Sequence, residues 1–282
     1  MDRETIKCIL TNGYNDDNTF LFHYTSLEAC CSIIESRQLH MGNLANTNDP
    51  LEFCGFPGPY FIGNVETTDM TRKYEENKEA QNLRNRTVRI LCFCQDFTYS
   101  ELRKITPFIN APMPNFADNL LSKGWARARM WAQYADNHRG TCLVFNKAEF
   151  KEQFNKMEKD GVRLIENEIT YTNILADFES AMTPEISETN LKEDFSEFYL
   201  DEKRLPFLFR KCEDFRDENE YRFCIIDKTL QSLGETVSVD IGDSLKAVIL
   251  GTKVSPAIKI IPLFSRPIEQ FRIQWHFGMP EL

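Results

Sequence analysis

The chain has 282 residues, of which 42% are hydrophobic and 12% aromatic, with 33 Lys and Arg against 43 Asp and Glu. This apolar content excludes a chain that is disordered throughout, and the net charge of −10 opposes non-specific nucleic-acid binding, which depends on neutralised phosphates. No apolar run approaches the ~20 residues of a membrane-spanning helix and the N-terminus has no signal-peptide pattern, so we expect a cytoplasmic protein that does not bind membranes. The nine Cys are irregularly spaced, which indicates reduced thiols.

The first half of the chain alternates short strands, helices and turns. Residues 1–20 are predicted to be a polar lead-in. Thr25 and Glu28 have the spacing of a capping box, which places a helix from there to about Ser36. The other predictions for this half are strands at 21–24, 38–44 and 87–94, a turn at 46–50, a loop at 54–64 and a solvated helix at 71–86.

The second half begins with a Pro-rich loop at 105–116 and an amphipathic helix from Ala117 to Asn137. On that helix Trp131, Tyr134 and His138 are predicted to share one face, and Gly140 is predicted to end it as a left-handed cap. Strands are expected at 141–145, 162–171, 236–241, 245–250 and 272–275, with acidic helices within 177–202. The resulting fold class is α+β, a single domain over residues 21–282 whose mixed, mostly antiparallel, curved sheet carries helical insertions.

The stretch from Asp217 to Ile226 passes from a charged turn into an apolar strand. Glu218 and Glu220 lie two residues apart, so on a strand their carboxylates would face the same way. Two carboxylates aimed at one place suit acid–base chemistry or sugar binding, and they are equally typical of a solvated strand end.

Other catalytic signatures are missing from the sequence. It contains no Gly-rich phosphate loop, no Walker motif and no nucleophile elbow. The four His are scattered and no CxxC or HxxxH pairing is present, so we expect no metal site. A catalytic Cys/His pair is not excluded by the sequence, but no local motif indicates one.

Six stretches of the chain form a recognisable set: 22–27, 48–52, 91–94, 130–145, 218–222 and 248–251. Together they resemble a large bacterial family known as a domain of unknown function, family 2971. The resemblance covers about residues 20–252, and its most specific part is the Trp131–Phe145 stretch. Cys94 stands where Ser is common in the family, and Thr47 where Phe usually precedes the Asn-Asp-Pro turn.

A second resemblance rests on the order of His23 on a first strand, Phe93 on a middle strand and Glu220 on a late strand. This order is similar to ADP-ribosyltransferases, including toxins that modify DNA. It implies an ADP-ribosyltransferase-like fold and an NAD-dependent ADP-ribosyltransferase, with NAD hydrolysis as a side or main reaction. Glu220 would then stabilise the cation formed as nicotinamide leaves NAD, the substrate. It also implies that Glu218 serves the acceptor, a protein or a nucleic acid, in a toxin or phage-defence setting with a possible regulatory partner.

The same resemblance implies a set of residues that bind NAD. Arg127 or Arg139 would meet the pyrophosphate. Each position has a structural alternative: Trp131 and Tyr134 as core residues, His23 as a buried histidine and His138 as a helix cap. The alternative function is a non-catalytic nucleotide- or partner-binding module of the same fold, and a nuclease-like effector is a third. The implied NAD-binding residues are His23, Tyr24, Thr25, Asn48, Asp49, Phe93, Trp131, Tyr134 and Arg222.

Overall fold

The computed structural model describes residues 1–11, 19–53, 87–98, 100–101, 120–172, 208–227, 236–259 and 268–282. Four predicted regions lie largely or wholly outside these residues: the loops at 54–64 and 105–116, the solvated helix at 71–86 and the acidic segment at 177–202.

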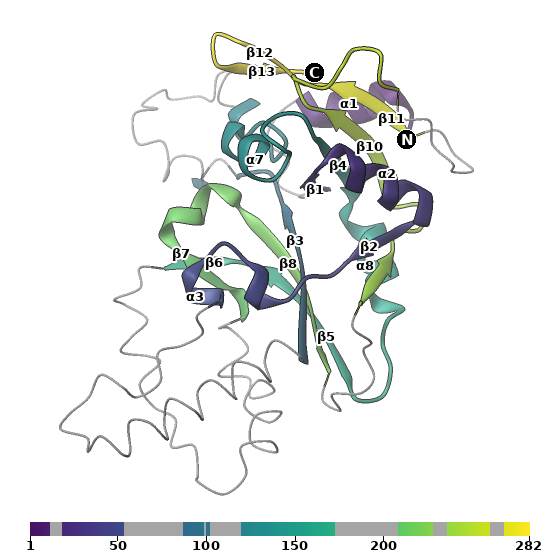
Figure 1. Ribbon diagram of the computed structural model, residues 1–282, viewed down its shortest axis with the longest axis vertical. Coiled ribbons are helices and arrows are strands. Elements are labelled where there is room, and N and C mark those ends of the chain that lie inside the picture. The colour runs from purple at the N-terminus through teal and green to yellow at the C-terminus, as the bar shows by residue number, and fades with distance from the viewer. Residues whose placement is uncertain are drawn as a thin grey trace, which may run out of the picture.

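The described helices and strands follow one another along the chain as shown in Figure 1. In order they are α1 (Arg3–Thr11), β1 (Phe20–Thr25), α2 (Leu27–Ser36), β2 (Gln38–His40), η1 (Leu44–Asn46), α3 (Pro50–Phe53), β3 (Val88–Cys94), α7 (Ala128–Gln133), β4 (Thr141–Asn146), α8 (Lys147–Asn155), β5 (Val162–Glu168), β6 (Thr170–Thr172), β7 (Arg210–Cys212), η3 (Glu213–Glu218), β8 (Glu220–Asp227), β9 (Ser238–Asp240), β10 (Leu245–Leu250), β11 (Glu269–Arg272), β12 (Gln274–His276) and β13 (Met279–Glu281).

Seven of the described strands form one open sheet in the order β11-β10-β4-β1-β3-β8-β5. Every neighbouring pair is antiparallel except β10 and β11, which are parallel. The prediction of a mixed, mostly antiparallel sheet is therefore confirmed. In Figure 1 the long strands β3 and β8 run side by side, with α3, β6 and β7 to one side and α2 and α8 to the other.

The sheet opens between β1 and β3. β1 pairs with β4 over its whole length, but it pairs with β3 only where Phe22 lies opposite Cys94. Farther along β3, two backbone hydrogen bonds join Gly42 to Ile90. The segment around Gly42, and not β1, therefore pairs with this part of β3. Cys92 lies between these two pairings, at the point where the strands separate.

The apolar side chains form separate clusters on the two faces of the sheet. On one face Phe93, Phe145 and Phe223 pack edge to face with Phe150 of α8, which accounts for part of the high Phe content. On the other face, one cluster gathers around Trp131 under α1 and α7, and a second surrounds Cys224 near η1. Two charged residues described below, Glu220 and Arg222, lie on this face of β8, between Cys94 of the first of these clusters and Cys224 of the second.

Three details of the predicted helices are wrong. The N-cap of α2 is Ser26, whose Oγ accepts from the Ala29 amide at 3.1 Å, because Thr25 still belongs to β1. The apolar spacing in α2 predicts that Leu27, Cys30, Cys31 and Ile34 form its buried stripe, but Cys31 is exposed and Ile33 is buried. The segment predicted as a lead-in contains α1, which buries Ile6 and Leu10.

The predicted helix from Ala117 to Asn137 is much shorter among the described residues, where α7 ends at Gln133. Asp136, Asn137 and His138 follow it with positive φ values of 45°, 50° and 69°. The left-handed turn is therefore made by these three residues and not by Gly140. Gly140 is needed for space, because a Cβ there would lie 2.2 Å from the Thr25 carbonyl oxygen.

Candidate functional site

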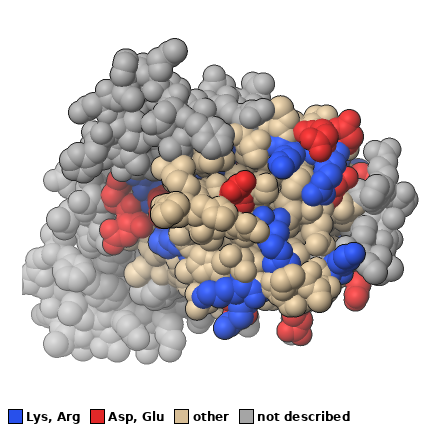
Figure 2. Space-filling view, turned by 90° about the horizontal axis from the view of Figure 1, so that it is seen from above, with Lys and Arg blue, Asp and Glu red and all other residues tan. Residues whose placement is uncertain are grey.

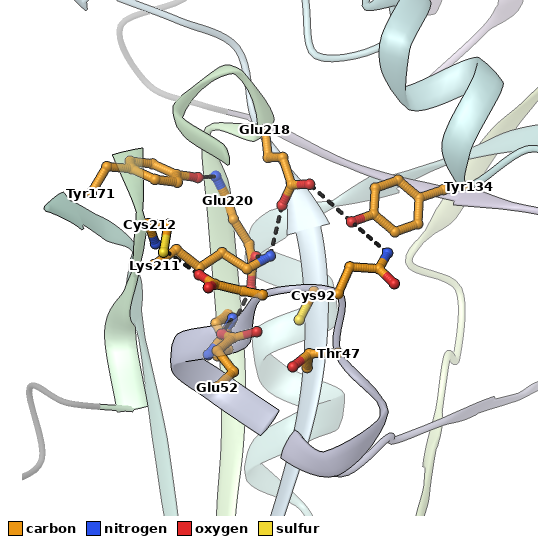
Figure 3. Close-up of polar contacts among 12 residues, drawn as sticks. Thr47, Glu52, Cys92, Tyr134, Tyr171, Lys211, Cys212, Glu218 and Glu220 are labelled. Atoms are coloured by element: carbon orange, nitrogen blue, oxygen red, sulfur yellow. Dashed lines mark hydrogen bonds and ion pairs between the residues drawn. The ribbon is translucent and has the colours of Figure 1, made fainter. Parts of the chain in front are cut away.

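Five buried charged side chains of alternating sign form a continuous chain at one end of β8. We call Glu52, Arg222, Glu220, Lys211 and Glu218 the charge chain (Figure 3). Arg222 donates to Glu52 through one nitrogen and to Glu220 through Nε at 2.7 Å, and Lys211 Nζ lies 2.7 Å from a carboxylate oxygen of both Glu220 and Glu218. None of the five side chains is more than 6% exposed. Charges this far from water are stable only when paired, and these are.

Four elements bring these charges together. Glu52 comes from α3, Lys211 from β7, Glu218 from the end of η3, and Glu220 and Arg222 from one face of β8. The start of β8 is also held in place through its backbone, because the Tyr171 hydroxyl of β6 accepts a hydrogen bond from the Glu220 backbone amide at 2.8 Å. Arg222 also donates to the Leu208 carbonyl at 2.7 Å. The charge chain is thus part of the packing of α3, β7 and η3 against the start of β8.

The electrostatics favour the ionised forms of the inner groups. Burial alone would raise the pKa of Glu220, but the neighbouring Arg222 and Lys211 outweigh it and lower the pKa to about 2. Burial likewise opposes the charge on Lys211, and the carboxylates around it raise its pKa well above the usual value. For Glu52 burial dominates and raises the pKa. Glu220 and Lys211 are therefore a fixed ion pair at neutral pH.

The outer end of the charge chain reaches the surface through Tyr134. Tyr134 OH donates to Glu218 Oε1 at 2.9 Å and accepts from the amide of Asn48 at 3.3 Å. The Tyr134 ring is half-buried and Asn48 is exposed. Burial, with Glu218 next in importance, raises the pKa of the Tyr134 phenol, which stays protonated.

Arg129 is the outermost cation in contact with the chain. Its guanidinium binds Asp217 through two nitrogens, at 2.7 and 2.5 Å, and it lies 3.4 Å from Glu218 Oε1. The Arg129 side chain is 36% exposed. A ligand arriving at Glu218 would therefore meet a phenol, an amide and a guanidinium together.

The carboxylates of Glu218 and Glu220 point to the same place, as predicted. The reason is not the alternation of side chains along a strand, because only Glu220 lies on one. Glu218 ends a 3-10 helix, Asn219 adopts the left-handed conformation with φ 41° and ψ 59°, and only Glu220 begins the strand. The left-handed residue turns the chain so that both carboxylates contact Lys211. Both are buried, which excludes the alternative of a solvated strand end.

His23 does not join Glu220. The His23 ring packs edge to face on Phe93 at 5.6 Å, on the face of the sheet that carries α8, whereas Glu220 shares the opposite face with Cys92. His23 Nδ1 lies 3.2 Å from the Cys92 carbonyl oxygen. Burial lowers the pKa of His23, so the ring is neutral at pH 7. His23 and Glu220 therefore lie on opposite faces of the sheet and do not face one cleft.

Most of the other predicted NAD-binding residues serve the core. Tyr24 donates to the Gly124 carbonyl at 2.6 Å and packs edge to face on Trp131, whose indole donates to the Trp125 carbonyl at 2.7 Å. Phe93 is buried among other Phe rings. Trp131, Tyr134 and His138 do not share a helix face, since the helix ends before Tyr134.

The remaining predicted positions have structural partners. Thr25 closes β1 opposite Thr141. Asp49 is buried and accepts from the Cys212 amide at 2.7 Å, which ties the turn before α3 to β7. Arg139 pairs with Asp136 on the surface, and Arg127 is buried with backbone partners, so Arg127 is not placed to meet a pyrophosphate.

The structure therefore brings together Glu218, Glu220, Arg222, Tyr134 and Asn48 from the predicted set. It adds two residues that sequence reasoning missed, Lys211 and Glu52. Glu52 lies in the stretch 48–52 that carries the family resemblance, which was a usable signal. For Lys211 the sequence gives only an indirect signal. Two neighbouring carboxylates at the start of a buried strand require a nearby cation, but the sequence does not show which residue supplies it.

Two broader features are limited to the part of the chain described above. No helix there is long and apolar enough to cross a membrane. Nor do three or more His, Cys, Asp or Glu side chains gather in those ranges as the ligands of a metal ion would.

Comparison with known proteins gives one family. Residues 130–223 match the model of a family described as "Protein of unknown function (DUF2971)". The search of curated proteins and the search of solved structures each gave no match. The matched range runs from α7 into β8 and includes Tyr134, Lys211, Glu218, Glu220 and Arg222. Over these residues the chain thus carries the sequence pattern of that family, which is the family that its own motifs resemble.

Proposed function

We propose that the protein is a nucleotide-binding module that takes the ribose of its ligand at the outer end of the charge chain. The observation that supports this is the connection from a buried carboxylate to the surface, from Glu218 through Tyr134 to Asn48. A ribose hydroxyl can replace the Tyr134 phenol as the donor to Glu218, in the way that acidic residues bind ribose in dinucleotide sites.

The charge balance favours a ligand group that donates hydrogen bonds there. The charge chain has three carboxylates and two cations, and the next cation, Arg129, is shared with Asp217. A sugar hydroxyl meets this excess of negative charge favourably, whereas a phosphate would not. A phosphate of the same ligand would lie farther out, toward the half-exposed guanidinium of Arg129.

Isothermal titration calorimetry with NAD, ADP-ribose and a nucleotide that lacks both ribose hydroxyls tests this function. We expect NAD and ADP-ribose to bind and the dideoxynucleotide to bind at least about tenfold more weakly, since a hydrogen bond to a charged group contributes about 1.5–3 kcal/mol. Glu218→Gln should weaken binding, and Tyr134→Phe should strengthen it, because the hydroxyl that the ribose displaces is gone. Glu269→Gln, at a surface pair with Arg3, should leave the affinity unchanged. Failure of all three ligands to bind would refute the proposal.

Tyr134→Phe is the more informative of the two variants. It removes one hydroxyl and leaves every ion pair of the charge chain in place, so the fold should persist. Glu218→Gln removes one of the two carboxylates on Lys211, and its melting temperature must be measured beside its affinity. Wild-type affinity in both variants would place the ligand elsewhere.

A second function, ADP-ribosyl transfer or hydrolysis of NAD, is supported by one further observation. Lys211 fixes Glu218 and Glu220 on a single ammonium, and Glu218 is the one whose other oxygen contacts Tyr134 at the open end. In such a reaction the C1′–N bond to nicotinamide breaks, nicotinamide leaves with the electron pair, and the acceptor adds to C1′ as its proton passes to Glu218. A fixed carboxylate stabilises the ribosyl cation on this path.

Incubation with labelled NAD separates the two functions. Release of nicotinamide that is lost in Glu218→Gln supports the enzyme, and tight binding without release supports the module. Added protein, DNA or RNA identifies an acceptor if label transfers to it. Among the described residues on the face in Figure 2, Lys and Arg are interspersed with Asp and Glu, without the continuous basic surface that suits a nucleic-acid acceptor.

A further inference from the structure

The turn that presents Glu218 is held from behind by a buried arginine. Arg127 is 7% exposed, and its two terminal nitrogens donate to the carbonyl oxygens of Glu218 and Gln95. Its guanidinium also lies over the Phe97 ring, 4.2 Å from the ring centre. Arg127 thus joins the end of β3 to the end of η3 through the backbone alone.

Asn219 fastens the same turn from the next position. Its side-chain nitrogen, Nδ2, donates to the backbone carbonyls of Asp96, at 2.8 Å, and Gln95, at 3.3 Å. The Gln95 amide in turn donates to the Asn219 carbonyl at 3.0 Å. Asn tolerates the left-handed conformation that this position requires, so the residue supplies both the shape of the turn and its anchor.

The segment that receives these bonds is itself fixed. The two carboxylate oxygens of Asp96 accept from Lys123 Nζ at 3.0 Å and from the Gly124 amide at 2.7 Å, and Lys123 also reaches the Ile9 carbonyl of α1. Asp96 and Lys123 are both buried. The turn is therefore attached to a part of the molecule that has little freedom to move.

We propose that Arg127 and Asn219 are positioning residues that hold the Glu218 carboxylate at the ligand site without contacting the ligand. This inference rests on the proposed function. Its physical basis is that Glu218 has a left-handed residue directly after it, so that a small change at Asn219 swings the carboxylate away from Tyr134. A misplacement of about 1 Å in such a site can cost on the order of a hundredfold in function.

Asn219→Gly tests the inference without straining the left-handed turn, because Gly adopts this conformation freely and the variant loses only the side-chain amide that anchors the turn. We expect this variant to melt within a few degrees of the wild type and to bind NAD or ADP-ribose at least about tenfold more weakly. Asn219→Asp also tolerates the conformation but cannot donate to the two carbonyls, and it should lose affinity as well. Wild-type affinity in Asn219→Gly would overturn the role of the amide.

Arg127→Lys addresses the other half of the clamp. A lysine keeps the charge but cannot reach both carbonyls as the planar guanidinium does. We expect weaker ligand binding in this variant too, and affinity equal to wild type would overturn the assignment of Arg127.

A measurement without ligand separates this inference from the proposed function. With ¹³C-labelled tyrosine, NMR reports the chemical shift of Tyr134 Cζ, assigned by its loss in Tyr134→Phe. This shift depends on the hydrogen bond from the phenol to Glu218, so displacement of Glu218 in Asn219→Gly should move it relative to wild type. If no nucleotide binds the wild type but this shift moves, the proposed function fails and the positioning role stands. An unchanged shift overturns the positioning role.

Discussion

His23 and Glu220 contact the same residue, Cys92, from opposite faces of the sheet. His23 Nδ1 lies 3.2 Å from the Cys92 carbonyl oxygen at the opening between β1 and β3, and on the other face the Cys92 side chain helps to lower the pKa of Glu220. Side chains on successive strand positions alternate between faces, and the pairing of Phe22 with Cys94 puts His23 on the Phe93 side. A single ligand therefore cannot lie between the two, which is why the proposed site is built around Glu218.

Glu220→Gln should act mainly on stability. The substitution leaves Lys211 and Arg222 buried with one carboxylate fewer between them, and breaking a buried ion pair costs about 3–5 kcal/mol. Denaturant unfolding of the variant should show a loss of that order in the free energy of unfolding.

Glu269→Gln is the matched control for that measurement. It makes the same chemical change at a partly exposed pair with Arg3, where at most about 1 kcal/mol is expected. If Glu220→Gln unfolds at the wild-type denaturant midpoint, the charge chain does not hold the fold together as described.

The position of His23 predicts how stability depends on pH. Burial lowers its pKa in the folded protein below the ordinary value of 6.5, so the unfolded chain binds protons more readily. The stability that His23 contributes is therefore complete above pH 6.5 and is lost as the pH falls through that value toward the folded pKa.

His23→Gln should reduce the loss of unfolding free energy between pH 7.5 and 5.5. His138, whose pKa burial and Lys253 also lower, should still contribute its own loss, and the double variant should be flatter than either single variant. Denaturant unfolding at several pH values measures this. The same slope in wild type and His23→Gln would contradict the assigned environment of the ring.

The strands were predictable from sequence where both of their faces are buried. β3, β4 and β10 are mostly apolar, with Arg89 and Lys246 as the charged exceptions, and the structure has them within a residue or two of the predicted bounds. The end of α7 was not predictable in this way. The helix ends at Gln133 and the backbone becomes left-handed at Asp136, but the apolar spacing continues past the helix to the buried Ala135. Packing of Gly140 against Thr25 and Gly251 against His138 decides that turn, and such contacts leave no periodic trace.

The candidate site was predictable only where its residues are neighbours in sequence. Glu218, Glu220 and Arg222 lie in one short stretch and could be found together. Lys211 reaches them from another strand, and Asn48 meets Tyr134 across 86 positions of the chain. Such pairings follow from the sheet topology, which local spacing does not encode.

Trp131→Ala should show that this residue belongs to the core. The side chain is fully buried, packs on Tyr24 and donates to the Trp125 carbonyl, so its removal should cost about 3–5 kcal/mol of unfolding free energy. Affinity for a nucleotide, measured below the lowered melting temperature, should stay near the wild-type value. Loss of affinity with stability retained would place the indole in the binding site. Phe277→Ala, at a fully exposed ring, is the control and should change stability by less than about 0.5 kcal/mol.

Gly140→Ala tests the close approach that ends the left-handed turn. The new methyl group would lie 2.2 Å from the Thr25 carbonyl oxygen and 2.9 Å from backbone atoms of Ala135, and no flexible side chain can move aside to relieve these contacts. Overpacking of this kind costs about 1–3 kcal/mol or more, so the variant should unfold at lower denaturant concentration. Gly42→Ala is the matched control, because the nearest atom to a Cβ there is 4.0 Å away. Equal stability in the two variants would mean that β1 and the turn before β4 are not in the close contact described, and that the turn keeps its shape for another reason.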